Sequence, residues 1–184
     1  MIWRYRITLE GKKGFFRVYQ VDPACTLYKF HKQLRADLEF PVDQPILFKA
    51  FDAEGGVVAR YALMDIGCGS VDKISLAQTR QKGISSFQYF YDTSARKYVI
   101  VTFEGEEEGS VASPTAIESK GPVPAAFDNG YVAFEDLPQQ PRHLHDDDEG
   151  KGFDEEDEEE EEDDGDEEDA ADREEEELIY DGNE

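Results

Sequence analysis

The chain has 184 residues and a formal net charge of −25, from 19 basic and 44 acidic residues. This length suits one domain with a tail, or two small domains. The charge is uneven, because residues 146–184 hold 26 acidic and 2 basic residues, whereas residues 1–145 hold 18 and 17. A nearly neutral body is therefore followed by a polyanion, which rules out reading the body's partners from the charge of the whole chain.

Cysteine usage and hydropathy exclude further classes of protein. The two cysteines, Cys25 and Cys68, are too few for a disulfide framework and lack the clustered ligands of a zinc site, so we expect reduced, partly buried thiols. The first ten residues carry two arginines and a glutamate, unlike a signal peptide. No window approaches the roughly 20 uncharged apolar residues of a membrane span. The sequence therefore predicts a cytoplasmic protein without a membrane partner.

The first third of the chain predicts a hairpin and a helix. Apolar and polar residues alternate over residues 3–10, which is typical of a half-buried strand. The turn GKKG and a second strand over residues 15–21 complete the hairpin. Thr26 is the expected N-cap of an amphipathic helix, because apolar residues then recur at helical spacing up to Leu38.

Two more hairpins and a short helix follow. Residues 46–51 and 57–63 predict strands joined by a glycine-containing turn, and Ser75 is the expected cap of a helix over residues 76–82. The arms of the last hairpin, residues 84–105, are apolar on both faces, so we expect it in the middle of a sheet and covered on both sides. The order β-β-α-β-β-α-β-β predicts an α+β fold, with a mostly antiparallel sheet and helices on one face.

Three parts of the chain are predicted from these patterns. Residues 1–109 form the α+β domain, and residues 110–145 form an extended, proline-containing segment that packs on it through its aromatic residues. Residues 146–184 are predicted to be disordered, because almost pure Asp, Glu and Gly cannot bury enough apolar surface to offset the ordering entropy. An apolar cluster near the end of this acidic tail is a candidate docking element: Leu178, Ile179 and Tyr180.

Several short motifs occur in a fixed order within residues 1–109. They are ITLEG from Ile7, the pair Phe16-Arg17, TLYKFH from Thr26 and FQYFYD from Phe87. Together they resemble the plasmid Ri ORF-three-like domain family, also labelled an insertion-element passenger protein. The chain departs from the family pattern in lacking the acidic, tryptophan-containing turn after FQYFYD and a histidine near residue 44. The resemblance implies an α+β fold and a bacterial, often mobile-element-linked setting, with no established enzymatic activity.

Four positions that match the family are candidates for a functional or structural role: Arg17, His31, Tyr91 and Asp92. His31 is the best polar candidate, and the alternative is a partly buried histidine bonded to a backbone carbonyl. Arg17 and Asp92 are expected to pair across the sheet, which is a structural role. The functional alternative, which is less favoured, is that Arg17 binds an anion.

No catalytic, cofactor-binding or metal-binding residue is predicted. The cysteines lack an activating base, and the loop at residues 67–70 lacks the Gly-Lys-Ser/Thr ending of a phosphate-binding loop. His143 and His145 stand beside acidic residues, but their spacing predicts only adventitious ion binding. An enzyme is accordingly the least favoured class.

The acidic tail is the most distinctive feature, because its field attracts basic proteins and mimics a nucleic-acid backbone. The leading hypothesis is a non-enzymatic interaction domain whose tail binds a basic protein partner. The alternative is a mobile-element-associated nucleic-acid-binding protein, less favoured, in which the tail is autoinhibitory because it competes for the lysines and arginines of the body. A merely solubilising, self-repelling tail stays open on equal terms with a tail that binds a partner.

Overall fold

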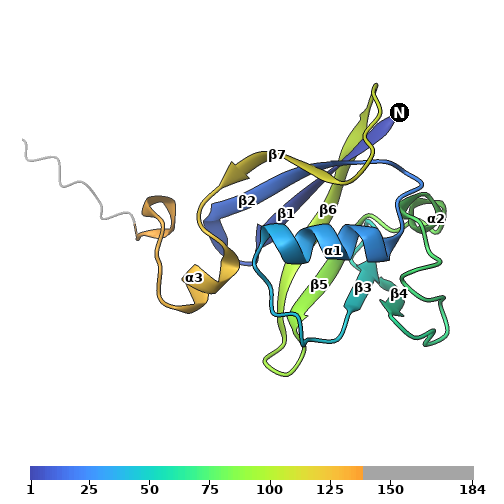
Figure 1. Ribbon diagram of the computed structural model, residues 1–184. Helices are drawn as coiled ribbons and strands as arrows, with labels where there is room; N and C mark the ends of the chain where they lie inside the picture. The colour runs from blue at the N-terminus through green and yellow to red at the C-terminus, as the bar shows by residue number, and fades with distance from the viewer. Residues whose placement is uncertain (139–184) are drawn as a thin grey trace, which may run out of the picture. The chain divides into compact units, whose positions relative to one another are not determined.

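The computed structural model describes residues 1–138, and the structural statements below concern that part of the chain. It contains one seven-stranded antiparallel sheet in the order β4-β3-β5-β6-β1-β2-β7 (Figure 1). The strands are β1 (Ile2–Leu9), β2 (Lys12–Val21), β3 (Leu47–Phe51), β4 (Val57–Ala62), β5 (Ser86–Asp92), β6 (Lys97–Glu107) and β7 (Thr115–Lys120). The helices are α1 (Leu27–Asp37), α2 (Leu76–Gln81), α3 (Pro124–Asp128) and a 3₁₀ turn, η1 (Phe134–Asp136).

The predicted α+β class and the mostly antiparallel sheet are confirmed, but the exact order of elements differs. The predicted order ended at the last hairpin, whereas the chain continues with β7, α3 and η1. β7 lies between Pro114 and Pro122 and pairs with β2 at the edge of the sheet. An edge strand needs only one hydrogen-bonded neighbour, so a short stretch bracketed by prolines can serve there.

The hairpin of β5 and β6 lies in the middle of the sheet, as predicted, with β6 as the central strand. The expectation that both of its faces are covered is wrong. Phe87, Tyr89 and Tyr91 are buried on one face, but Phe90 on the other face is only half-buried and Thr102 is exposed. On that second face the ring of Phe90 packs against another residue of the same hairpin, Tyr98.

Helix α1 lies across the sheet and closes the core on one face (Figure 1). The ring of Phe30 meets Tyr5 of β1 and Tyr19 of β2, at centroid distances of 5.7 and 5.8 Å. The predicted N-cap is confirmed, because the side chain of Thr26 accepts a hydrogen bond from the backbone N–H of Lys29. The capped start and the buried apolar stripe together fix where α1 begins and which face it turns to the sheet.

Helix α2 is bound to the start of α1. Ser75 and Gln78 form a capping box at its N-terminus, as expected of the predicted cap. The backbone N–H of Leu76 donates to the carbonyl of Cys25 at 2.9 Å, and the N–H of Leu27 donates to the carbonyl of Ile74 at 2.9 Å. The two helix starts therefore satisfy part of each other's backbone hydrogen-bonding capacity.

The segment after β7 packs on the body through α3. Phe127 meets Phe15 of β2 edge to face at 6.0 Å. Asp128 accepts a hydrogen bond from the hydroxyl of Tyr91 at 3.3 Å and pairs with Lys97 at 3.1 Å, so α3 is joined to both arms of the central hairpin.

The 3₁₀ turn η1 is attached by polar contacts rather than by its aromatic residue. The carboxylate of Asp136 accepts the backbone N–H groups of Lys13 at 2.6 Å and Gly14 at 3.3 Å. Glu135 pairs with Lys120 of β7 at 2.8 Å. Phe134, one of the aromatic residues expected to pack on the domain, is 86% exposed.

Several sequence predictions fall on residues 139–184, outside the described part of the chain: the acidic tail, its cluster of Leu178, Ile179 and Tyr180, and the histidine pair His143 and His145. Within residues 1–138, no helix is both long enough and apolar enough to cross a membrane.

Candidate functional site

His31 is part of the core. It is only 2% exposed, its Nδ1 shares a 2.8 Å hydrogen bond with the hydroxyl of Tyr89, and its ring stacks on Tyr28. Burial, reinforced by the positive charges of Arg35 and Lys32, lowers the pKa of His31 to about 4. The imidazole is therefore neutral near pH 7 and joins α1 to β5. The hydrogen bond of His31 is thus made with a tyrosine side chain, whereas the alternative from the sequence expected a backbone carbonyl as the partner.

Arg17 joins β2 to the chain leaving β7. It is 9% exposed, and its guanidinium donates to the carbonyls of Phe16 at 2.8 Å and Gly121 at 2.9 Å. Asp92 accepts the backbone N–H of Ala95 at 2.8 Å within the β5–β6 turn. Two strands separate β2 from β5, so the predicted pairing of Arg17 with Asp92 is wrong. Because Arg17 is occupied by carbonyl groups, it does not offer a free site for an anion.

Tyr91 anchors the α3 segment to the sheet. Its ring stacks on Phe40 with a centroid distance of 4.4 Å and an interplanar angle of 2°, and its hydroxyl donates to Asp128. Burial, together with the neighbouring carboxylate, raises the pKa of Tyr91. The four family-matched positions thus lie in separate structural contacts and do not converge on one site.

Cys25 is a poor candidate nucleophile, and the loop at residues 65–70 is a poor candidate phosphate cradle. Both thiols are free, and burial raises the pKa of Cys25 to about 11, which suppresses the reactive thiolate. In the loop, Oδ1 of Asp65 accepts the N–H groups of Gly67 at 2.8 Å and Gly69 at 2.9 Å. These hydrogen bonds lower the pKa of Asp65. The chain's own carboxylate therefore occupies the place that a phosphate would take.

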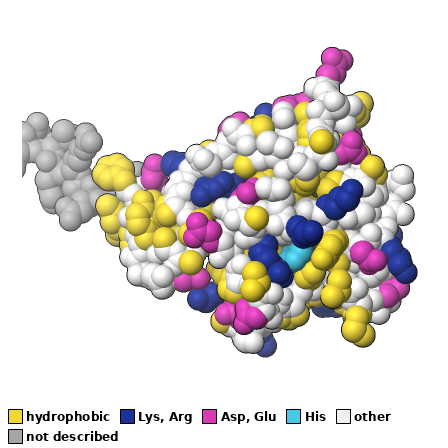
Figure 2. Space-filling model, in the orientation of Figure 1, with side chains coloured by type: hydrophobic (Ala, Val, Ile, Leu, Met, Phe, Trp, Pro, Cys, Tyr) yellow, Lys and Arg dark blue, Asp and Glu magenta, His cyan; other side chains and the backbone are white. Residues whose placement is uncertain are grey.

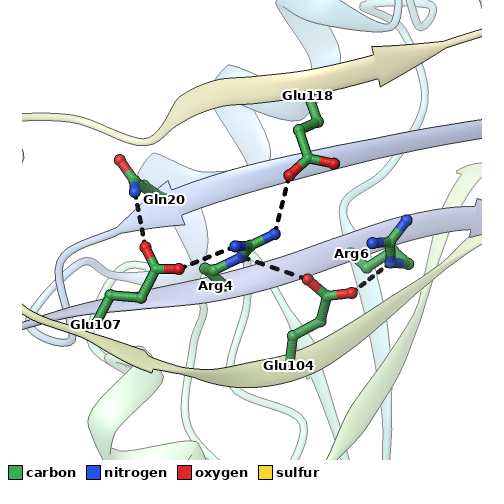
Figure 3. A network of polar contacts seen from close by, with 6 residues as sticks. All are labelled: Arg4, Arg6, Gln20, Glu104, Glu107 and Glu118. Carbon is green, nitrogen blue, oxygen red and sulfur yellow. Dashed lines mark hydrogen bonds and ion pairs between the residues drawn. The ribbon is translucent and has the colours of Figure 1, made fainter.

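A charge network lies on the sheet face opposite α1 (Figure 3). Arg4 reaches Glu107 at 2.9 Å, Glu118 at 3.1 Å and Glu104 at 3.5 Å. Glu104 also pairs with Arg6, so three carboxylates surround two guanidinium groups. Arg4 and Arg6 are consequently neutralised by carboxylates of the body itself.

Two β-bulges bring the carboxylates to Arg4. β6 carries the extra residue Glu104 opposite the step from Arg4 to Tyr5, and β7 carries the extra residue Ile117 opposite a step in β2. Bulges re-aim neighbouring side chains, and here they converge on one guanidinium. The alternation of β1 indicated that Arg4 faces solvent, but nothing in the local sequence identified partners about 100 residues away.

A second cationic region lies on the exposed side of α1. Lys29 and Lys32 are exposed, and within residues 1–138 neither forms an ion pair. Figure 2 shows Lys and Arg side chains gathered over α1. Beside them is a groove of about 640 Å³, bounded by residues 22–25, by α1 and by residues 111–114 of the β6–β7 loop. We call it the α1 groove.

Comparisons with known proteins define the fold and leave the activity open. No family model matches the chain, and no curated protein matches it. Among solved structures, a protein of unknown function, MM3350 from Methanosarcina mazei Go1, matches with a TM-score of 0.55 and 19% identity. The match covers 66% of this chain and 70% of that one. At this identity the similarity shows the fold alone.

Proposed function

We propose that this chain is a non-enzymatic interaction domain whose acidic tail, residues 146–184, binds a basic protein partner. The observation that carries the proposal is the network in Figure 3, where Arg4 and Arg6 are already paired with glutamates of the body. The excess negative charge of the sequence therefore belongs to the tail, which holds 26 acidic residues against 2 basic ones.

A polyanion of this kind recognises its partner mainly through charge. Because the Debye length is about 8 Å at physiological ionic strength, such binding weakens steeply as salt is added. It also accelerates encounter with a cationic surface more than it defines a single bound geometry. The folded body would then supply a fixed platform from which the tail acts.

The environments of the candidate chemical groups support a non-enzymatic role. His31 is neutral and 2% exposed, and the thiol of Cys25 is buried with a raised pKa. A general base or a nucleophile must reach its substrate and titrate near the working pH. We also propose, on the ordered motifs of residues 1–109, that the body belongs to the plasmid Ri ORF-three-like family.

The alternative, a nucleic-acid-binding body with an autoinhibitory tail, is favoured by Lys29 and Lys32 on α1. Several other basic residues are each engaged in a separate contact. Lys97 pairs with Asp128, and the guanidinium of Arg80 lies over an aromatic ring and donates to a backbone carbonyl. Nucleic acid needs several cations along one track, so this dispersion weighs against the alternative.

The test is a pull-down with two forms of the full-length chain as bait. In one, the eleven consecutive acidic residues 154–164 are replaced by the corresponding amides. At 50 mM salt the native chain should retain proteins with lysine- or arginine-rich segments and at 300 mM it should release them, whereas the amide variant, which keeps fewer of the tail's negative charges, should retain much less of them at 50 mM. Equal retention by both baits contradicts the proposal, because the tail charge would then be irrelevant.

A further inference from the structure

The α1 groove has the dimensions of a small-molecule site. Its volume of about 640 Å³ falls within the roughly 300–1,000 Å³ typical of ligand pockets. One wall is the first half of α1, the second is the turn at residues 22–25, and the third is the loop at residues 111–114. Three segments far apart in the sequence therefore contribute to one concave surface.

The charge of the groove comes from two lysines. Lys29 and Lys32 stand three residues apart on α1, which places both ammonium groups on the same side of the helix. The free N–H groups at the start of α1 are not available to a ligand, because those of Leu27 and Tyr28 already donate to the carbonyls of Ile74 and Val71. An anion in the groove would thus be held by side chains and not by the helix terminus.

One carboxylate, that of Asp22, also lines the groove. Its Oδ1 accepts the backbone N–H of Ala24 at 2.7 Å, which ties it to its own turn. The remaining lining is largely apolar or small, with the inert thiol of Cys25 on one wall and Val111 and Pro114 on another. A complementary ligand combines a strongly negative head with a compact apolar body.

We propose that the α1 groove binds a small phosphate monoester, with its phosphate between Lys29 and Lys32 and its apolar body against Val111 and Pro114. A phosphate monoester carries about −1.5 to −2 charges near pH 7, which matches two ammonium groups better than a single carboxylate does. This site contains no residue of the tail, so a negative result for the site would not contradict the proposed function, and a negative result for the tail would not contradict the site.

The test uses phenyl phosphate as the probe, titrated into the full-length chain at 0.15 M salt and followed by amide NMR. Saturable shifts should be confined to residues 22–33 and 111–114, and inorganic phosphate should bind at least fivefold more weakly. The double variant Lys29→Gln/Lys32→Gln should lose at least tenfold in affinity. Ala112→Glu, an exposed position on the loop, adds a carboxylate to the groove and should abolish binding.

The matched control is Lys12→Gln/Lys13→Gln, which removes the same charge from the start of β2 and should change affinity less than twofold. The proposal is overturned if the two double variants lose the same affinity for phenyl phosphate, because binding would then depend only on the net charge of the chain. It is also overturned if inorganic phosphate binds as tightly as phenyl phosphate. Tighter binding of a 12-nucleotide single strand than of phenyl phosphate would assign the lysines to a nucleic-acid surface instead.

Discussion

Acidification from pH 7.5 to pH 5 should weaken the fold through His31. The pKa of His31 is lowered from its ordinary value of 6.5 to about 4. The unfolded chain therefore binds a proton at His31 more tightly than the folded chain does. For this reason the stability of the fold decreases as the pH falls below 6.5, and the decrease is complete below pH 4. Linkage over the stated interval gives a loss of about 2 kcal/mol in the free energy of unfolding.

The groups that set this shift are known from the structure. Burial is the largest cause, followed by Arg35 and then Lys32, while Tyr89 and Tyr28 contact the ring as neutral partners. Carboxylates with lowered pKa values, such as Glu107, also destabilise the fold on acidification, because a depressed carboxylate pKa gives stability that is lost as the pH falls. Their loss starts near their ordinary pKa and falls mainly below pH 5.

Urea denaturation at the two pH values measures the effect, with His31→Gln as the matched variant. The variant will be less stable overall, but the difference between its free energies of unfolding at the two pH values should shrink to about 0.5 kcal/mol or less. The reasoning is refuted if the native chain loses less than about 0.5 kcal/mol, or if His31→Gln loses as much as the native chain does.

Three further substitutions test other contacts by urea denaturation. Gly121→Ala should lower the free energy of unfolding by roughly 3 kcal/mol or more, because φ is +75° and a Cβ would clash with a backbone carbonyl of β2. Gly130→Ala has φ +92° but open space around it, so it should lower the free energy of unfolding by only about 1 kcal/mol. Equal losses in the two variants would contradict the clash. Arg4→Gln should destabilise the fold more than Arg6→Gln does, and this difference in the free energy of unfolding should become smaller in 1 M salt. A difference that does not change with salt would contradict a stabilising charge network. Phe127→Ala should cost about 2 kcal/mol by undocking α3, and a change below about 0.5 kcal/mol would show that α3 does not hold there.

Local chemistry made the helices and most strands predictable. Thr26 and Ser75 each satisfy a backbone N–H within three residues, so their capping roles can be read from a short window of sequence. The alternation in β1 and the helical spacing in α1 likewise depend on neighbouring residues only. The mid-sheet position of the last hairpin was predicted as well, although the coverage of both its faces, from which that position was argued, is wrong.

Contacts between residues far apart in the sequence could not be predicted from such local patterns. Arg4 meets carboxylates more than 100 residues away, and their convergence depends on two bulges that carry no clear sequence mark. The strand β7 was missed because it is short, exposed and bracketed by prolines. The wall that residues 111–114 give to the α1 groove depends on that strand being in place.

The family-matched positions illustrate the same limit at the candidate site. Arg17 bonds to carbonyls beyond β7, His31 joins α1 to β5, and Tyr91 holds α3. Sequence order alone could not show that these residues act in three separate places. Their contacts are those of residues that stabilise a fold, whereas Lys29 and Lys32 on α1 are exposed and line a groove that a ligand can enter.

Fluorescence anisotropy on the full-length chain tests the central claim most directly. A labelled lysine-rich peptide and a labelled 20-nucleotide DNA strand are each titrated with the native chain and with the variant in which residues 154–164 are amides. The account predicts that the native chain binds the peptide in a salt-dependent way, that the amide variant binds it at least tenfold more weakly, and that neither form binds DNA. DNA binding gained by the amide variant, with a steep salt dependence, would contradict the claim and identify the tail as an autoinhibitor.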